Sequence, residues 1–234
     1  EMDQLSKLHF LRRWLLDPSL VDQEPDQAER IKGEKALALE KRLQDALEEG
    51  YMHVVVFVND VVEGILRPSK AASGGSCLVD RISLPADVKR GVIHGDTSSG
   101  ERKNLQDAFQ SREGRMVLFV SGNTADVGVD FSAGQRVISF NEPWTRYAHE
   151  QQRSRVYRPG VQNPVTSELL VSVNTVEQGI HEYVERKYHA IEKVLQGIPL
   201  SEIEKTLLEK DAATDGANAS FASEIAEQYL SAWD

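Results

Sequence analysis

The sequence predicts an α/β domain built in three layers, with a mainly parallel central sheet and helices on both of its faces. Short apolar runs such as HVVVFV at 53–58 and RMVLFVS at 115–121 are typical of strands buried on both sides. Amphipathic helical segments separate these runs, and such alternation indicates parallel strands joined by helices. With 234 residues, of which 40% are hydrophobic, the chain is long enough to bury a large core.

The first part of the chain predicts a helix, a strand and an insertion. Residues 35–50 carry leucines at every fourth position, which share one helical face, and the segment ends in a glycine. The strand at 53–58 follows directly. Residues 67–90 begin rich in Pro, Gly and Ser, so we expect a flexible insertion there, with a short strand at 77–82.

The second part of the chain continues the alternation. The expected strands are 91–96, 115–121, 135–141 and 167–173. The expected helices are 98–110, 145–157 and 175–197, and Ser98 is the predicted N-cap of the first. In the last helix, six apolar residues recur at helical spacing and are expected to pack on the sheet. They are Val176, Ile180, Val184, Tyr188, Ile191 and Leu195.

We divide the chain into a helical lead-in at 1–50, a central lobe at 51–198 and an acidic helical tail at 199–234. The formal net charge is −10. Residues 201–234 contribute −6, with eight acids against two bases, and the lead-in contributes −4, with twelve acids against eight bases. The middle of the chain is therefore balanced, and its charge does not exclude a polyanionic partner. The tail is a candidate contact for other proteins.

The composition argues against several classes of protein. No apolar run approaches the roughly 18 to 20 residues of a membrane helix, and the N-terminus lacks the pattern of a signal peptide. We therefore expect an intracellular protein, in the cytoplasm, nucleoid or nucleus, without membrane contact. The single Cys77 permits no internal disulfide and no cysteine-based metal site, and the six histidines lack the spacing of metal ligands.

Three polar segments are expected beyond the carboxyl ends of the strands, where parallel sheets bind their ligands. They are HGDTSSGER at 94–102, SGNTADVGVDF at 121–131 and QQRSRVYRPG at 151–160. The last segment contains three clustered arginines. A guanidinium presents several fixed donors and keeps its charge, which suits it to phosphate groups.

The order of these segments resembles the C-terminal RecA-like lobe of superfamily-two helicases, and specifically the SWI/SNF-type DNA-dependent ATPases. VVVFVN is similar to motif IV, HGDTSSGERKNLQDAFQ to the segment after it, and SGNTADVGVDFSAGQRVISFNEPW to motif V. QQRSRVYRPG is similar to motif VI, Gln-x-x-x-Arg-x-x-Arg-x-Gly. LHFLRRWLLDPSLV is similar to the segment that leads into this lobe, with Asp17 in place of a histidine. The resemblance covers most of the chain.

The resemblance implies a RecA-like fold of the P-loop NTPase type and a role as one lobe of an ATP-dependent helicase or translocase. It implies that Arg155 and Arg158 act as arginine fingers on ATP, and that Gln151 helps to set the cleft between two lobes. Further residues implied near the nucleotide are Gly128, Asp130 and Gly160. The implied nucleic-acid contacts are Gly95, Thr97, Ser98, Arg102, Ser121, Gly122, Asn123 and Thr124.

By the same resemblance, ATP and Mg²⁺ are held mainly by a separate N-terminal RecA-like lobe, in the same parent chain or complex. The sequence contains no Gly-x-x-x-x-Gly-Lys-Ser/Thr loop and no Asp-Glu pair placed after a strand. We therefore expect the chain to hydrolyse no ATP by itself. The expected nucleic acid is DNA, double-stranded rather than single-stranded.

The chain departs from the family at a few positions. Ala125 and Asp126 stand where the family has paired glycines, Asp130 stands where it has Asn, and Val161 stands where it has Gln. Since side chains hinder an approach that glycine permits, the first departure weakens the case for close backbone contact with nucleic acid. Asp130 and Ser121 either contact a strand backbone, contact the motif VI helix or cap their loop.

Three further side chains each have two candidate roles. Arg153 is either functional or held in a surface ion pair. Arg102 pairs with a phosphate, or with Asp96 or Glu101. Trp144 either packs under motif VI or stacks on a base. The whole chain also has two competing interpretations, a non-catalytic lobe that binds nucleic acid or protein as a regulatory module, and an unrelated flavodoxin-like enzyme.

Overall fold

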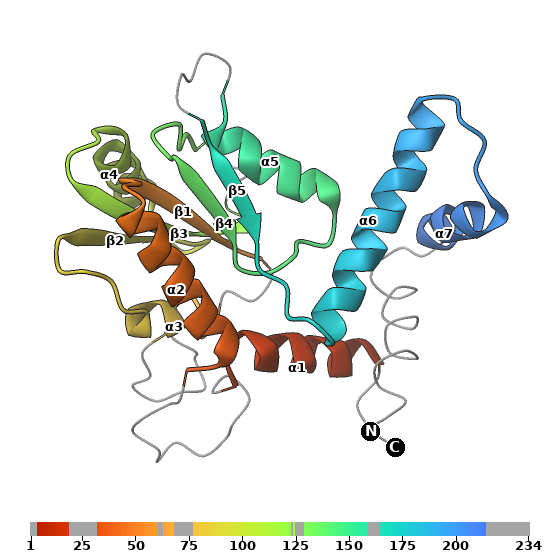
Figure 1. The fold of residues 1–234 in the computed structure, drawn as a ribbon, viewed down its shortest axis with the longest axis horizontal. Coiled ribbons are helices and arrows are strands. Elements are labelled where there is room, and N and C mark those ends of the chain that lie inside the picture. The colour runs from red at the N-terminus through yellow and green to blue at the C-terminus, as the bar shows by residue number, and fades with distance from the viewer. Residues whose placement is uncertain are drawn as a thin grey trace.

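Five parallel strands form the central sheet in the part of the chain that the computed structural model describes, which is residues 4–18, 32–59, 63–67, 77–122, 124, 129–158 and 164–213 (Figure 1). The strands are β1 (His53–Val58), β2 (Val88–Ile93), β3 (Arg115–Ser121), β4 (Arg136–Ser139) and β5 (Thr166–Leu169). The helices are α1 (Gln4–Leu16), α2 (Glu34–Glu48), α3 (Leu78–Arg81), α4 (Ser99–Gln110), α5 (Arg146–Val156), α6 (Val176–Leu195) and α7 (Glu202–Ala213). The strand order β2-β3-β1-β4-β5 places β1 at the centre.

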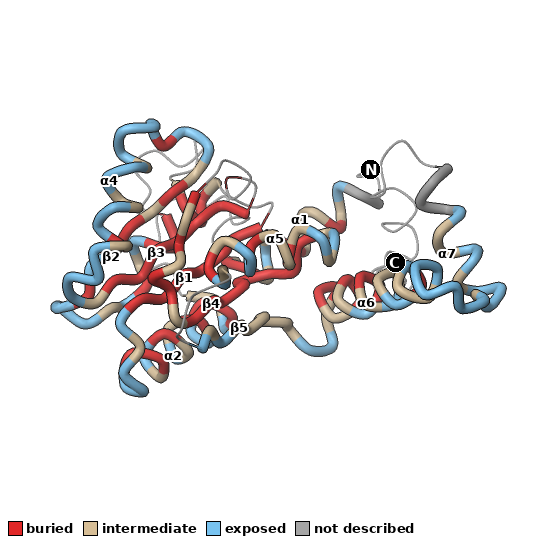
Figure 2. Tube along the Cα trace, turned by 90° about the horizontal axis from the view of Figure 1, so that it is seen from above, coloured by how far each residue is buried: buried red, intermediate tan, exposed pale blue. Residues whose placement is uncertain are grey.

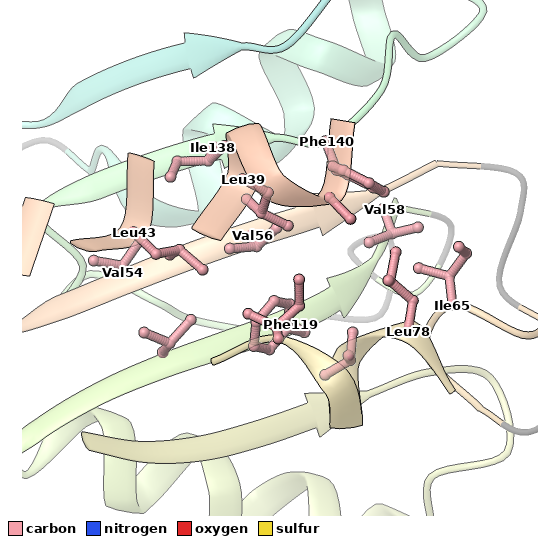
Figure 3. Packing of buried hydrophobic residues seen from close by; sticks show 14 of the residues in the cluster. Leu39, Leu43, Val54, Val56, Val58, Ile65, Leu78, Phe119, Ile138 and Phe140 are labelled. Atoms are coloured by element: carbon pink, nitrogen blue, oxygen red, sulfur yellow. The ribbon is translucent and has the colours of Figure 1, made fainter. Parts of the chain in front are cut away.

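β1 is buried along its whole length because helices cover both faces of the sheet. Its side chains alternate between two hydrophobic clusters. The cluster on the α2 and α3 face includes Leu39, Leu43, Val54, Val56, Val58, Ile65, Leu78, Phe119, Ile138 and Phe140 (Figure 3). The cluster on the α4 and α5 face includes Val55, Phe57, Phe109, Leu118, Val120 and Val156. The predicted three-layer α/β fold is therefore confirmed.

The other predicted strands and helices are found with small shifts of their ends. β2 covers Val88–Ile93, and so begins before the predicted 91–96. The N-cap at Ser98 is confirmed, because its Oγ accepts a hydrogen bond from the backbone N–H of Glu101 at 3.2 Å. This bond satisfies one of the backbone donors that the first turn of a helix leaves unpaired.

Residues 77–82 are helical, so the strand predicted there is wrong. α3 begins after Cys77, whose backbone N–H donates to Asp80 Oδ2 at 3.2 Å. Leu78 and Val79 are buried in the hydrophobic cluster on the α2 and α3 face of the sheet. This part of the predicted insertion therefore belongs to the packed fold. A short apolar run does not distinguish a buried helical turn from a strand. Residues 68–76 lie outside the described part of the chain.

α6 does not pack on the sheet, and that prediction is also wrong. Its buried residues form a separate cluster with α1, consisting of Leu8, Val176, Ile180, Tyr183 and Val184. Figure 2 shows α6 and α7 set to one side of the sheet, and Ile191 and Leu195 near the end of α6 are exposed. The helical periodicity is present, but the apolar face meets another helix. No described helix, α6 included, combines the length and apolar character needed to cross a membrane.

Charged side chains tie β4, β5 and α2 together at one edge of the sheet. Glu168 of β5 accepts a hydrogen bond from Arg42 Nε at 2.7 Å and pairs with Arg136 of β4. Arg136 is buried and also pairs with Glu49 at 2.6 Å. Burial acts to raise the pKa of Glu168, but hydrogen bonds from Arg136 and Arg42 outweigh it and hold that pKa below its usual value.

Replacing Glu168 by glutamine should make folding stability less sensitive to acid. A carboxylate whose pKa is lowered in the folded state stabilises fully above its unfolded pKa, about 4.3, and loses that contribution as the pH falls through its folded pKa. Urea midpoints of the wild type should therefore fall more steeply below about pH 5 than those of Glu168→Gln, while at neutral pH the variant is the less stable protein. Parallel pH profiles would contradict this, and the exposed Glu113→Gln should behave like wild type.

Candidate functional site

Helix α5 carries the arginine motif and lies on the sheet face opposite α2 (Figure 1). It begins after Thr145, whose hydroxyl accepts a backbone hydrogen bond from the first turn at 3.1 Å. His149, Gln152 and Val156 form its buried face, at the spacing expected for one side of a helix. The sequence therefore directs this face inward and leaves most of the charged residues toward the surface.

The three clustered arginines have different surroundings. Arg153 is exposed and pairs with Glu150 at 2.9 Å, which is the surface ion pair that the sequence left open. Arg158 Nε lies 3.5 Å from Asp130 Oδ1, and both side chains are partly exposed. Arg155 is half-buried, and its Nε is buried without a hydrogen-bond partner among the described residues. Arg155 thus keeps donors that no described carboxylate uses.

α5 runs back along the sheet from the end of β4, and this decides where the arginines lie. Arg155 O accepts a hydrogen bond from Phe131 N at 2.9 Å. Val156 packs over Gly134, where a Cβ would come 2.8 Å from Val156 Cγ1. Residues 129–135 lead into β4, so Arg155 and Arg158 lie beside that segment. The prediction that the arginine cluster extends beyond the carboxyl ends of the strands is therefore wrong for these two residues.

Three buried amide side chains join α5 to the carboxyl ends of β1 and β4. Asn141 Oδ1 accepts from Asn59 N at 2.8 Å, and Asn141 Nδ2 donates to Asn59 O at 2.7 Å. Asn59 Nδ2 donates to Asn141 O at 2.7 Å, and Asn59 Oδ1 accepts from Gln152 Nε2 at 2.6 Å. The residues Asn59, Asn141 and Gln152 are 3%, 0% and 2% exposed. We call these three residues the amide clamp.

Gly122, at the start of motif V, rests directly on the amide clamp. A Cβ at this position would lie 2.0 Å from Asn59 Oδ1 and 2.7 Å from Gln152 Nε2. Any side chain would therefore collide with the hydrogen bond between those two residues. Packing alone requires glycine here, and the contact of Gly122 with nucleic acid stays a prediction.

The first predicted nucleic-acid segment forms a tight turn before α4. Thr97 is buried, and its Oγ1 accepts a hydrogen bond from His94 N at 2.9 Å. Arg102 is half-buried and donates to Thr97 O at 3.3 Å, and no ion pair joins it to a neighbouring acid within the described ranges. Gly95 and Ser98 are exposed. Of the residues predicted to contact nucleic acid here, Gly95, Ser98 and part of Arg102 are therefore at the surface, beside the exposed Asp96, which pairs with Arg67.

The remaining predicted site residues are less accessible or lie outside the described part. Ser121 and Thr124 are buried, at 3% and 5% exposed, so their side chains do not form the surface of this lobe. Gln151 is half-buried on α5. Outside the described residues lie Asn123, Ala125, Asp126, Gly128 and Gly160. The roles of all these residues in binding stay predictions.

Trp144, just before α5, is held between helices. The guanidinium of Arg12 lies 4.1 Å from the centroid of its ring and donates to Glu142 O at 2.8 Å. Trp144 also packs against the cluster that α1 and α6 form. Oε2 of the buried Glu142 lies 3.0 Å from His181 Nδ1, and burial raises the pKa of Glu142. These contacts support the packing interpretation of Trp144.

The histidines near the site add no positive charge to it at neutral pH. The pKa of His149 on α5 is lowered, first by burial and then by the neighbouring Arg146. The pKa of His94 is lowered in the same way, by burial and by Arg67. These two histidines therefore add nothing to the charge of the neighbouring arginines.

The amide clamp is the feature of the site that the sequence analysis missed. Asn59 directly follows a buried strand, and a polar residue at that place is the available signal. Its partners lie 82 and 93 residues away in the chain. Such distant pairs are not visible in motif spacing, because spacing describes only residues that are close in sequence.

Comparisons with known proteins identify the family. The model of the helicase conserved C-terminal domain matches residues 34–160, more than half of the chain. The lymphoid-specific helicase of Homo sapiens is 24% identical over 186 residues, which cover 80% of this chain and 20% of that protein. The transcription regulatory protein SNF2 of Saccharomyces cerevisiae is 29% identical over 111 residues, which cover 47% of this chain and 6% of that protein. The chain thus spans a fifth or less of these relatives.

A solved structure of the Sulfolobus solfataricus SWI2/SNF2 ATPase core in complex with dsDNA shares the fold. Its TM-score is 0.56 at 22% identity, and the match covers 77% of this chain and 35% of that one. The predicted RecA-like fold is therefore confirmed. The chain belongs to the helicase conserved C-terminal domain family, and it is similar to the SNF2 regulatory protein and to the SWI2/SNF2 ATPase core.

Proposed function

We propose that this chain is the C-terminal motor lobe of an ATP-dependent DNA translocase, and that it supplies arginine fingers to ATP held by a separate N-terminal lobe. The observation that carries the proposal is the state of Arg155. Its half-buried guanidinium forms no ion pair with a described residue, whereas Arg153 two positions earlier pairs with Glu150 at 2.9 Å. A half-buried guanidinium with unused donors is suited to an anionic partner from outside the lobe.

The donors fit the phosphate chain of ATP. When bound, ATP supplies the phosphoryl group that is transferred to water, and negative charge then spreads over the phosphate oxygens. Arg155 and Arg158 would stabilise that charge, and Asp130, which accepts from Ser132 N at 2.9 Å, would hold Arg158 in place. Gln151 lies one turn before Arg155 and is proposed to help set the cleft. Mg²⁺ prefers oxygen ligands, and we assign it mainly to the N-terminal lobe.

The turn before α4 is the proposed nucleic-acid contact of this lobe. Backbone amides, a hydroxyl at Ser98 and the guanidinium of Arg102 can hold phosphates without reading bases. Binding should therefore be independent of sequence and should weaken with salt. We propose double-stranded DNA as the substrate, because the Sulfolobus ATPase core that shares this fold was solved with dsDNA. The proposed setting is intracellular.

By itself, the 234-residue chain should hydrolyse no ATP, with or without double-stranded DNA. It lacks the glycine-rich loop and lysine that cradle the phosphates, and arginine fingers act only on ATP that is already bound. Release of inorganic phosphate by the purified chain checks this, with the two-lobed motor as the positive control. A DNA-stimulated rate from the chain alone would overturn the assignment of ATP binding to the other lobe.

A non-catalytic regulatory lobe is the second candidate function. Its support is that Ser121 and Thr124 are buried and that Ala125 and Asp126 replace the glycines of motif V. Such a lobe would bind nucleic acid or protein without needing Arg155. The two candidates therefore differ in what happens when Arg155 is removed.

A further inference from the structure

The hydrogen bonds of the amide clamp can run in only one direction. Asn59 Nδ2 donates to the backbone carbonyl of Asn141, a group that can only accept. Asn59 Oδ1 is therefore left as the acceptor, and the 2.6 Å bond must run from Gln152 Nε2 to Asn59 Oδ1. The clamp thus requires a donor at the end of the side chain at position 152.

The amide clamp lies under α5, at the carboxyl ends of the three central strands. Asn59 follows β1, Asn141 follows β4 and Gly122 follows β3. In the sheet, β1 lies between β3 and β4. The missing side chain of Gly122 lets the motif V backbone rest against the bond between Asn59 and Gln152. Since all three strands are buried, they form a rigid base to which Gln152 fastens the helix.

Gln152 lies three residues before Arg155, within one turn of α5. The other anchors in this turn are the apolar contact of Val156 with the core and the hydrogen bond from Phe131 N to Arg155 O. An apolar contact tolerates sliding and rotation, whereas a short hydrogen bond between buried amides fixes direction. Gln152 is thus the directional side-chain anchor nearest to Arg155 among the described residues.

We infer that Gln152 is a positioning residue for Arg155, acting through Asn59 and the strand ends to hold this one finger at its working place. The inference rests on the proposed function, because it assigns Gln152 no contact with ATP. A displacement of about 1 Å in a reacting group can lower a rate by about a hundredfold. Loss of the clamp should therefore lower catalysis while the lobe stays folded.

The test is Gln152→Met in the two-lobed motor, which keeps the volume of the side chain and removes its donor. The turnover number of DNA-stimulated ATP hydrolysis should fall about 10- to 100-fold, with little change in KM for ATP, because the fingers act mainly in the transition state. Arg153→Met is the matched control. Arg153 is exposed on the same helix and lies in a surface ion pair with Glu150, so this variant should stay close to wild type. Thermal melting confirms that each variant is folded.

A double variant separates positioning from a general structural effect. In an Arg155→Ala background, Gln152→Met should cause no further loss, because a residue that acts through Arg155 has nothing left to position. An equal loss in both backgrounds, or an unchanged turnover number in folded Gln152→Met, would overturn the inference. If Arg155→Ala alone leaves the rate intact, the proposed function fails instead. Should Gln152→Met not fold, Gln152→Asn, which keeps the amide but is one methylene shorter, should show the same fall.

Discussion

Replacing Arg155 by alanine should lower DNA-stimulated ATP hydrolysis by the two-lobed motor by about a thousandfold or more. The guanidinium of Arg155 is half-buried and forms no ion pair with a described residue, so its accessible N–H groups are the donors that the proposed function uses. Since the stabilised charge develops in the transition state, the loss should appear in the turnover number more than in KM. Steady-state phosphate release with saturating double-stranded DNA measures it.

Arg153→Ala is the control for this experiment. It removes a guanidinium from the same helix, but one that is exposed and paired with Glu150 at 2.9 Å, so the rate should stay near wild type. If Arg155→Ala hydrolyses ATP as fast as Arg153→Ala, the arginine-finger role is wrong. The regulatory-lobe interpretation would then account better for the fold of the chain.

Replacing Lys35 by methionine should destabilise the lobe by about 3–5 kcal/mol. Lys35 at the start of α2 pairs with Glu177 of α6, and their side chains are 5% and 4% exposed. Without Lys35, the Glu177 carboxylate stays buried with the backbone N–H of Ser172, at 3.0 Å, as its remaining hydrogen-bond donor among the described residues. Urea unfolding of the 234-residue chain measures the loss.

A second substitution, at Glu177, should restore the stability that Lys35→Met removes. Adding Glu177→Gln to Lys35→Met removes the buried charge but keeps an acceptor for Ser172, so most of the lost stability should return. Lys205→Met is the matched control, because it breaks an exposed pair with Glu202 and should have little effect. A double variant as unstable as Lys35→Met would show that the uncompensated charge is not the cause.

The fold was predictable where neighbouring residues decide it. The alternation of HVVVFV places Val54 and Val55 on opposite faces of β1, and both are fully buried as the pattern predicts. The prediction failed at 77–82, where four apolar residues suit either a helical turn or a strand. It failed again for α6, whose periodicity indicates an apolar face but not which partner the face will meet.

The sequence by itself determined the parallel sheet, the family and the presence of the arginine motif, because each is written in residues that are close along the chain. The tertiary structure alone decided which arginine is paired. It also decided that Arg155 lies beside the segment leading into β4, and that Gln152 fastens the helix to Asn59. These facts depend on groups up to 93 residues apart in the amide clamp and 130 residues apart between Arg12 and Glu142. Only the folded chain brings such groups within hydrogen-bonding distance, so no local sequence pattern can predict these contacts.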